Sequence, residues 1–144
     1  MLLTLDHIDL VVADVQSSVE FYRLLGVDIP GDAVWEQNGD AHHVEVVLPS
    51  GLRLGIDSIA MTKGYDPGWE QAEGSRNIFI FSAPNREAVD EIFGRMTAAG
   101  YASYKEPFDV FWGARYAILN DPDGNHVGVM SPSDPEHQTS PPGI

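Results

Sequence analysis

The chain has 144 residues, enough for one domain with a buried core and too few for a multidomain enzyme. Hydrophobic residues make up 43% of it and charged residues 21%, which excludes a fully disordered, collagen-like or coiled-coil chain. It has 22 Asp and Glu residues against 8 Lys and Arg, a formal net charge of -14, so nucleic acid and anionic membranes are poor partners and cationic small molecules are favoured. Acidity that only confers solubility explains the charge about equally well.

The sequence has no cysteine, which excludes disulfides, thiolate metal sites, iron–sulfur clusters and cysteine nucleophiles. Residues 1–6 contain no basic segment, and no apolar run approaches the roughly 20 residues that a membrane span needs. We therefore expect a soluble, cytoplasmic protein.

The sequence contains an internal repeat of a strand, a helix and a glycine stop. Residues 7–26 read HIDLVVADVQSSVEFYRLLG, and residues 77–100 read NIFIFSAPNREAVDEIFGRMTAAG. Apolar residues recur at spacings of three and four in both helical parts. Asp14 and Asn85 stand where helix N-caps belong, and Gly26 and Gly100 where the left-handed C-cap belongs.

Three short β-like runs follow each predicted helix. They cover residues 33–37, 42–48 and 52–58 in the first half, and 102–106, 114–119 and 125–130 in the second. The pattern predicts an α+β fold of two βαβββ modules, at residues 1–59 and 77–131. Residues 60–76, with Tyr65 and Trp69, would be a connecting loop that is a plain linker or a lid. Residues 132–144, rich in proline, are predicted to be a disordered tail.

The paired modules, the opening HIDLVVADV...FYRLLG and the closing FWGARYAILNDPDGN resemble the vicinal oxygen chelate superfamily. This family includes glyoxalase I, extradiol dioxygenases, fosfomycin resistance enzymes and bleomycin resistance proteins. The resemblance covers about residues 4–131. It implies two mixed sheets curved into a shared cup with helices outside, and a homodimer, for which Phe108, Phe111 and Trp112 offer an apolar cluster.

The resemblance also indicates where the enzymes of this family hold a metal ion, on the first and last strands of the modules. The matching positions here are His7, its repeat counterpart Asn77, Gly55 and Gly128. Glycine has no side chain to ligate, and Asn is a poor ligand for a catalytic divalent ion. We therefore expect neither a metal at this site nor another cofactor. An unrelated cluster drawn from His42, His43, Glu45 and His126 remains an alternative.

Alternation along the strands predicts which side chains line the cup. The expected ligand-binding residues are His7, Asp9, Arg53, Asp57, Asn77, Phe79, Phe81, His126 and Met130, with Val11 beside them, and Ile8, Leu10, Val12, Ile78, Ile80, Leu52, Leu54, Ile56, Val127 and Val129 would then pack under the helices. The phenylalanines could equally fill the core. The arginines at 53 and 115 could simply pair with carboxylates.

Trp112 matches the position that, in the bleomycin resistance proteins, lies against the bound drug. A dimer contact is the alternative role for this side chain, and Trp35 and Trp69 are weaker candidates.

Two functions follow from these features. The first is metal-independent binding or sequestering of a small, antibiotic-like, cationic aromatic molecule. The second is a glyoxalase- or dioxygenase-like enzyme, with an atypical metal set or with His7 and Asp9 as base and orienting group. His7 could instead be a purely structural, hydrogen-bonded residue.

Overall fold

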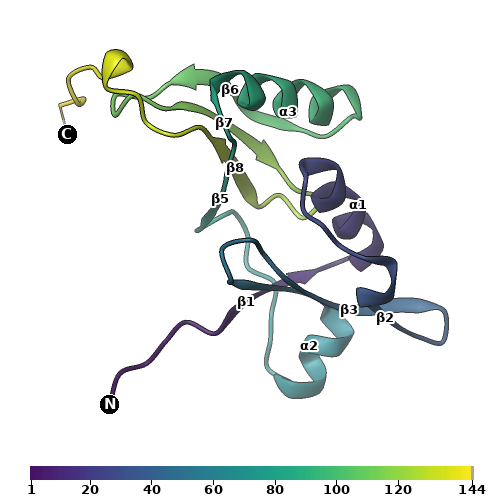
Figure 1. Cartoon of the computed structure of the whole chain (residues 1–144). Coiled ribbons are helices and arrows are strands. Elements are labelled where there is room, and N and C mark those ends of the chain that lie inside the picture. The colour runs from purple at the N-terminus through teal and green to yellow at the C-terminus, as the bar shows by residue number, and fades with distance from the viewer. Residues whose placement is uncertain (144) are drawn as a thin grey trace. The chain divides into compact units, whose positions relative to one another are not determined.

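The computed structural model describes residues 1–143, which form two compact units: Met1–Ala72 and a second unit that begins at Glu73. We describe each unit by itself. Both have the predicted strand–helix–three-strand order, so the α+β fold of paired βαβββ modules is confirmed (Figure 1).

The first unit contains a four-stranded sheet of order β1-β4-β3-β2. Its elements are β1 (His7–Val12), α1 (Val15–Leu25), a 3-10 turn (Gly31–Ala33), β2 (Val34–Gln37), β3 (Asp40–Val47), β4 (Arg53–Ser58) and α2 (Ile59–Tyr65). Strand β1 runs parallel to β4, and the other neighbours are antiparallel. Helix α2 occupies part of the predicted connecting loop because Ser58 caps it, its hydroxyl accepting a hydrogen bond from the backbone N–H of Met61 at 3.0 Å.

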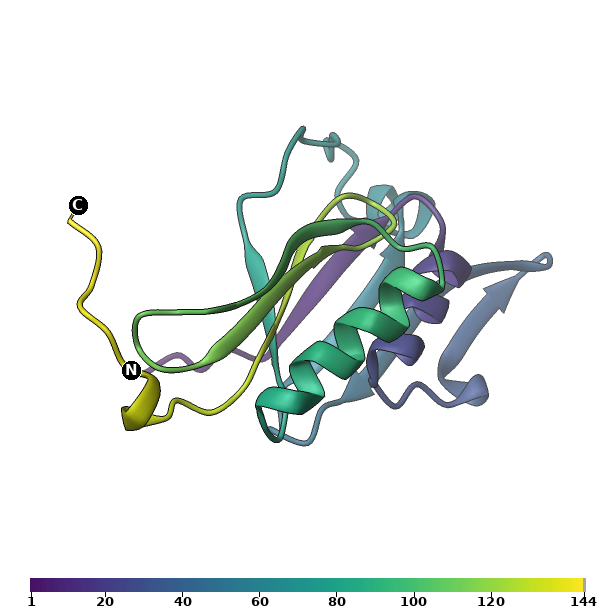
Figure 2. The same cartoon turned by 90° about the horizontal axis from the view of Figure 1, so that it is seen from above.

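The second unit repeats this arrangement, with the sheet order β5-β8-β7-β6. Its elements are β5 (Ile78–Ser82), α3 (Arg86–Ala98), β6 (Ser103–Asp109), β7 (Arg115–Asn120), β8 (His126–Met130) and a 3-10 turn (Pro135–His137). Strand β5 is parallel to β8, as β1 is to β4. Helix α3 runs across this sheet (Figure 2) and contacts β6, β7 and β8.

Three of the four predicted helix caps are found where the sequence places them, and α3 ends one residue early, with Ala99 as its C-cap and Gly100, at φ of +94°, directly after it. The Asp14 carboxylate accepts a hydrogen bond from the N–H of Ser17 at 3.0 Å, and the Asn85 side-chain oxygen accepts one from Ala88 at 2.8 Å. Gly26, with φ of +124°, ends α1 in the region that favours glycine. The helix boundaries are therefore set locally, by the residues that the sequence pattern identified.

The core of the first unit is the sheet face that meets α1. Alternate positions on its three longer strands supply the buried side chains of this face: Leu10, Val12, Val44, Val46, Leu54 and Ile56. Helix α1 contributes Val15, Val19, Tyr22 and Leu25. Each such aliphatic side chain contributes about 1.5–3 kcal/mol by burial. The predicted inner and outer faces of this sheet are confirmed, and its outer face is polar.

The second sheet corrects the predicted faces of β5. The parallel register pairs Phe79 with Val127 and Phe81 with Val129, and paired positions on neighbouring strands share a face. Both valines are fully or almost fully buried. The phenylalanines therefore lie on the core side, and the prediction that they face the same side as His126 and Met130 is wrong.

Ile78 and Ile80 occupy the face assigned to the phenylalanines, opposite His126 and Gly128. The prediction failed because IFIF is apolar on both sides and offers no polar residue to mark the outer face. The repeat counterpart of His7 is consequently Ile78, and Asn77 precedes the strand.

Residues 134–139 are held against the loop 111–113, in contrast to the disordered tail that the composition predicts. The backbone N–H of Asp134 donates to the carbonyl of Gly113 at 3.1 Å, and that of Thr139 donates to Phe111 at 2.9 Å. A Cβ at Gly113 would lie 2.2 Å from the carbonyl oxygen of Asp134, so only glycine allows this approach. Composition does not reveal such backbone pairing.

Among residues 1–143, no helix has both the length and the apolar character that a membrane crossing requires.

Candidate functional site

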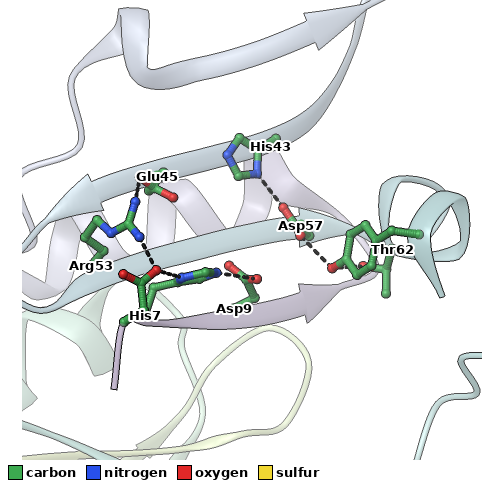
Figure 3. A network of polar contacts seen from close by, with 9 residues as sticks. His7, Asp9, His43, Glu45, Arg53, Asp57 and Thr62 are labelled. Atoms are coloured by element: carbon green, nitrogen blue, oxygen red, sulfur yellow. Dashed lines mark hydrogen bonds and ion pairs between the residues drawn. The ribbon is translucent and has the colours of Figure 1, made fainter. Parts of the chain in front are cut away.

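The outer face of the first sheet carries four of the ten predicted ligand-binding residues. We call it the polar face. It comprises the side chains of β1, β3 and β4 that point away from α1: His7, Asp9, Val11, His43, Glu45, Val47, Arg53 and Asp57, with Gly55 at its centre (Figure 3). Of the residues predicted to bind a ligand, the structure brings His7, Asp9, Arg53 and Asp57 together here.

Gly55 makes room for a carboxylate at the centre of the polar face. Its register partners are Asp9 on β1 and Glu45 on β3. A Cβ on Gly55 would lie 1.9 Å from Oδ1 of Asp9, which means that the Asp9 side chain lies across the glycine. The missing side chain therefore positions an acidic group over the middle of the sheet.

His7 is held between two carboxylates. Its Nδ1 lies 2.6 Å from Oδ2 of Asp6, and its Nε2 lies 3.2 Å from Oδ2 of Asp9. The hydrogen bond to Asp6, and then the charge of Asp9, raise the pKa of His7, while that hydrogen bond lowers the pKa of Asp6. Because ionised carboxylates only accept hydrogen bonds, this geometry suits an imidazolium that donates from both nitrogens. Such a ring has no lone pair to serve as a base or ligand.

Arg53 is the one arginine of the polar face, and its guanidinium is hydrogen-bonded to acidic side chains. Its guanidinium donates to Asp6 and, at 3.0 Å, to Oε1 of Glu45. Asp6, Asp9, Glu45 and Asp57 bring four carboxylates to this region against Arg53 and the imidazole of His7. The polar face is therefore acidic in balance.

His43, Asp57 and Tyr65 form a connected group at the α2 end of the polar face. Asp57 is only 3% exposed. Nδ1 of His43 lies 2.5 Å from its Oδ1, and the hydroxyl of Tyr65 donates to its Oδ2 at 2.8 Å (Figure 3). The Tyr65 hydroxyl also lies 3.4 Å from Oγ1 of the buried Thr62. No spacing in the sequence connects these three residues, although the pairing of the strands predicted at 42–48 and 52–58 places His43 opposite Asp57.

The residues at the family's metal positions do not fit a divalent ion. The register makes Ile78, and not Asn77, the counterpart of His7. Ile78, Gly55 and Gly128 have no side-chain atom that can bind a metal ion, and His7 is engaged by two carboxylates. No group of three or more His, Cys, Asp or Glu side chains within residues 1–143 is arranged to hold a metal ion.

Within the first unit, the alternative cluster of His42, His43 and Glu45 is not assembled on one face. Nδ1 of His42 lies 2.9 Å from the hydroxyl of Ser58, and by register these two lie on the side opposite His43 and Asp57. His126 belongs to the second unit, where its ring lies 4.0 Å from that of Tyr104.

The corresponding outer face of the second sheet is apolar. We call it the apolar face, and by register it includes Ile78, Ile80, Tyr116, Ile118, His126, Gly128 and Met130. A Cβ on Gly128 would lie 2.7 Å from the Tyr116 ring and 3.1 Å from Ile80, so here the glycine makes room for an aromatic ring. Burial raises the pKa of Tyr116.

The remaining predicted ligand contacts also lie in the second unit. Trp112 is 37% exposed, and its ring packs edge-to-face on Phe111 with centroids 5.0 Å apart. His126 and Met130 lie on the apolar face, and Asn77 accepts a hydrogen bond through its backbone carbonyl from Ser75. Arg115 pairs with Asp90 at 2.9 Å and with Asp109 at 3.2 Å, so carboxylates engage it, but they are not Asp9 or Asp57.

Solved structures with this fold include proteins of different descriptions. A glyoxalase/bleomycin resistance protein/dioxygenase family enzyme from Burkholderia phytofirmans PsJN is 17% identical, with a TM-score of 0.74 over 88% of this chain and 97% of that one. Lactoylglutathione lyase from Agrobacterium tumefaciens is 20% identical, with a TM-score of 0.63 over 89% and 92%. TioX from Micromonospora sp. ML1 is 19% identical, with a TM-score of 0.61 over 89% and 98%. At these identities the likeness shows the fold alone.

A search of curated protein sequences gives no significant match. The family model described as Glyoxalase/Bleomycin resistance protein/Dioxygenase superfamily matches residues 4–129, nearly the whole of both modules. The chain therefore belongs to the glyoxalase/bleomycin resistance protein/dioxygenase superfamily.

Proposed function

We propose that this protein binds and sequesters a small cationic organic molecule on the polar face of its first unit, without a divalent metal ion. The observation that carries the proposal is the Asp9 carboxylate lying across Gly55, with Glu45 paired to the same glycine. A family metal position is thereby replaced by an acidic, acceptor-rich surface.

The hydrogen-bonding groups of the polar face favour a ligand that is a donor. Carboxylates have only acceptor atoms, and the guanidinium of Arg53 is already bonded to Asp6 and Glu45. A protonated amine or an amidinium offers several N–H donors and a positive charge, and charge-assisted hydrogen bonds are about twice as strong as neutral ones. The net charge of -14 further attracts such a ligand at long range.

Calorimetric titration with benzamidine, a cationic aromatic amidine, tests the proposal, with neutral benzamide as the comparison. We expect benzamidine to bind in buffer containing EDTA and benzamide not to bind. Replacing Asp9 by Asn should weaken benzamidine by about tenfold, since a hydrogen bond to a charged group contributes roughly 1.5–3 kcal/mol.

The Glu20→Gln variant is the matched control, because it removes one negative charge from α1, away from the polar face. Its affinity should equal that of the wild type. Equal binding of benzamidine and benzamide, or equal losses in Asp9→Asn and Glu20→Gln, would contradict the proposal.

A further inference from the structure

The buried carboxylate of Asp57 fixes the hydrogen-bonding state of His43. Because Oδ2 accepts from Tyr65 and Oδ1 contacts Nδ1 of His43, the imidazole must donate from Nδ1. The lone pair of the neutral ring is then on Nε2, which points away from Asp57 (Figure 3). Among the described residues no group hydrogen-bonds to Nε2, and the His43 side chain is 33% exposed.

We propose that His43 is a general base that takes a proton from the molecule bound on the polar face, with Asp57 and Tyr65 as its positioning residues. This rests on the proposed function, because the substrate would be the cationic ligand itself. Asp57 would stabilise the imidazolium that forms, and Tyr65 would hold the Asp57 carboxylate in place. His7, which lacks a free nitrogen, does not offer this chemistry.

The charges around His43 indicate the class of substrate. Asp57 contacts His43, and Tyr65 contacts Asp57. Glu45 lies two positions from His43 along β3, and the Asp9 side chain lies across Gly55, the register partner of Glu45. The cationic groups of the polar face, Arg53 and His7, are paired with carboxylates at its other end. These surroundings disfavour an anionic intermediate such as an enolate. They stabilise a bound cation and also the imidazolium formed on His43, so the compatible reaction moves a proton from a cationic substrate to His43 and keeps the positive charge on the polar face.

A protonated imine with a C–H bond next to its C=N carbon meets this condition. Nε2 of His43 would take the proton from the carbon adjacent to the C=N carbon. The electron pair of that C–H bond would form the C=C bond, and the C=N π electrons would move to nitrogen. The product is a neutral enamine beside a His43 imidazolium. Return of a proton from the His43 imidazolium to carbon regenerates the protonated imine and the neutral imidazole, so the net reaction is proton exchange or isomerisation and needs no further reactant.

Proton exchange in 2-methyl-1-pyrroline, a small cyclic imine, tests the proposal. In D₂O, loss of the proton NMR signals next to the C=N carbon reports each removal step. We expect the wild type to accelerate this loss, and His43→Gln to reduce the protein-dependent rate by about 100-fold or more, the usual contribution of a general base. His42→Gln is the matched control, since His42 bonds to Ser58 on the other side of the sheet, and it should retain the wild-type rate.

Two further measurements separate a catalytic role from a structural one. Binding of the imine, measured by NMR titration, should stay within about twofold of wild type in His43→Gln, so that the loss is in rate and not in affinity. In Asp57→Asn, the nitrogen-15 spectrum should show His43 losing its fixed Nδ1–H tautomer together with the exchange activity. Tyr65→Phe leaves the hydrogen bond between His43 and Asp57 in place and should reduce the exchange rate by less than Asp57→Asn does. This variant tests the role of the group if Asp57→Asn fails to fold.

An imine that binds but exchanges equally fast in wild type and His43→Gln would overturn the base assignment and leave the proposed function standing. An Nε2–H tautomer in the wild type would also overturn it. Failure of the imine to bind while benzamidine binds would overturn the inference and leave the proposed function standing. Failure of both cations to bind would count against the proposed function, and the inference would fall with it.

Discussion

The two units share one framework but have opposite outer sheet faces. Both sheets pair their first strand in parallel with their last, and each has a glycine on the outer face of that last strand. At Gly55 the freed space holds the Asp9 carboxylate, and at Gly128 it holds the Tyr116 ring. The first outer face is consequently acidic and hydrogen-bonded, while the second is aliphatic and aromatic.

This difference shows that the repeated framework depends on the inner faces and the helix caps, and that the outer faces are free to differ. Buried aliphatic residues line the inner side of each sheet, and Asp14 and Asn85 begin the helices in the same way. The chemistry of a metal-binding position can therefore change without a change of fold. Equivalent glycines should respond differently to the same substitution, because their surroundings differ.

The largest expected effect on stability comes from Gly128→Ala. The added methyl group would meet the Tyr116 ring at 2.7 Å and Ile80 at 3.1 Å, and the buried ring has little space to move. Overpacking of this kind costs about 1–3 kcal/mol. Urea unfolding followed by far-UV circular dichroism measures it, and an unchanged midpoint would show that the Tyr116 ring is not packed on Gly128.

Gly55→Ala should change stability by less than about 1 kcal/mol, because the atom in its way is the end of a partly exposed Asp9 side chain. The displaced carboxylate should nevertheless lower benzamidine affinity by about tenfold. Paired unfolding and calorimetric experiments check both parts. A variant as destabilised as Gly128→Ala, or one with wild-type affinity, would contradict the comparison.

The smallest effect concerns the pH dependence of stability at His7. Since the folded state raises the pKa of His7, its contribution is fully present below the unfolded value of about 6.5 and is lost as the pH rises through the raised pKa. The difference in urea midpoint between wild type and His7→Gln should therefore shrink as the pH is raised above the unfolded value. In an Asp6→Asn background this dependence should weaken, because the hydrogen bond to Asp6 is its largest cause.

The sequence predicts the framework well because local signals determine it. The N-caps at Asp14 and Asn85, the C-cap at Gly26 and the polar alternation of HIDLVV define the elements and the outer face of the first sheet. The face of β5 could not be determined in this way, because Phe79 and Ile80 are equally apolar and only the pairing with β8 distinguishes them.

The candidate site was predictable only in part. His7, Asp9, Arg53 and Asp57 follow from alternation along single strands. The link from His43 through Asp57 to Tyr65 depends on strand register and on helix α2, which lies in a segment predicted to be a loop. Contacts of this kind join three elements and are not visible in the spacing of any one of them.

The central claim, that the polar face binds a cation without a metal ion, is tested most directly by amide NMR. Benzamidine would be titrated into nitrogen-15-labelled protein in buffer containing EDTA, with benzamide titrated in parallel. The account predicts saturable shifts concentrated at the outer-face residues of β1, β3 and β4 with benzamidine, and none with benzamide. Shifts confined to the sheet of the second unit, equal shifts with both compounds, or binding that appears only when a divalent metal is added would contradict it.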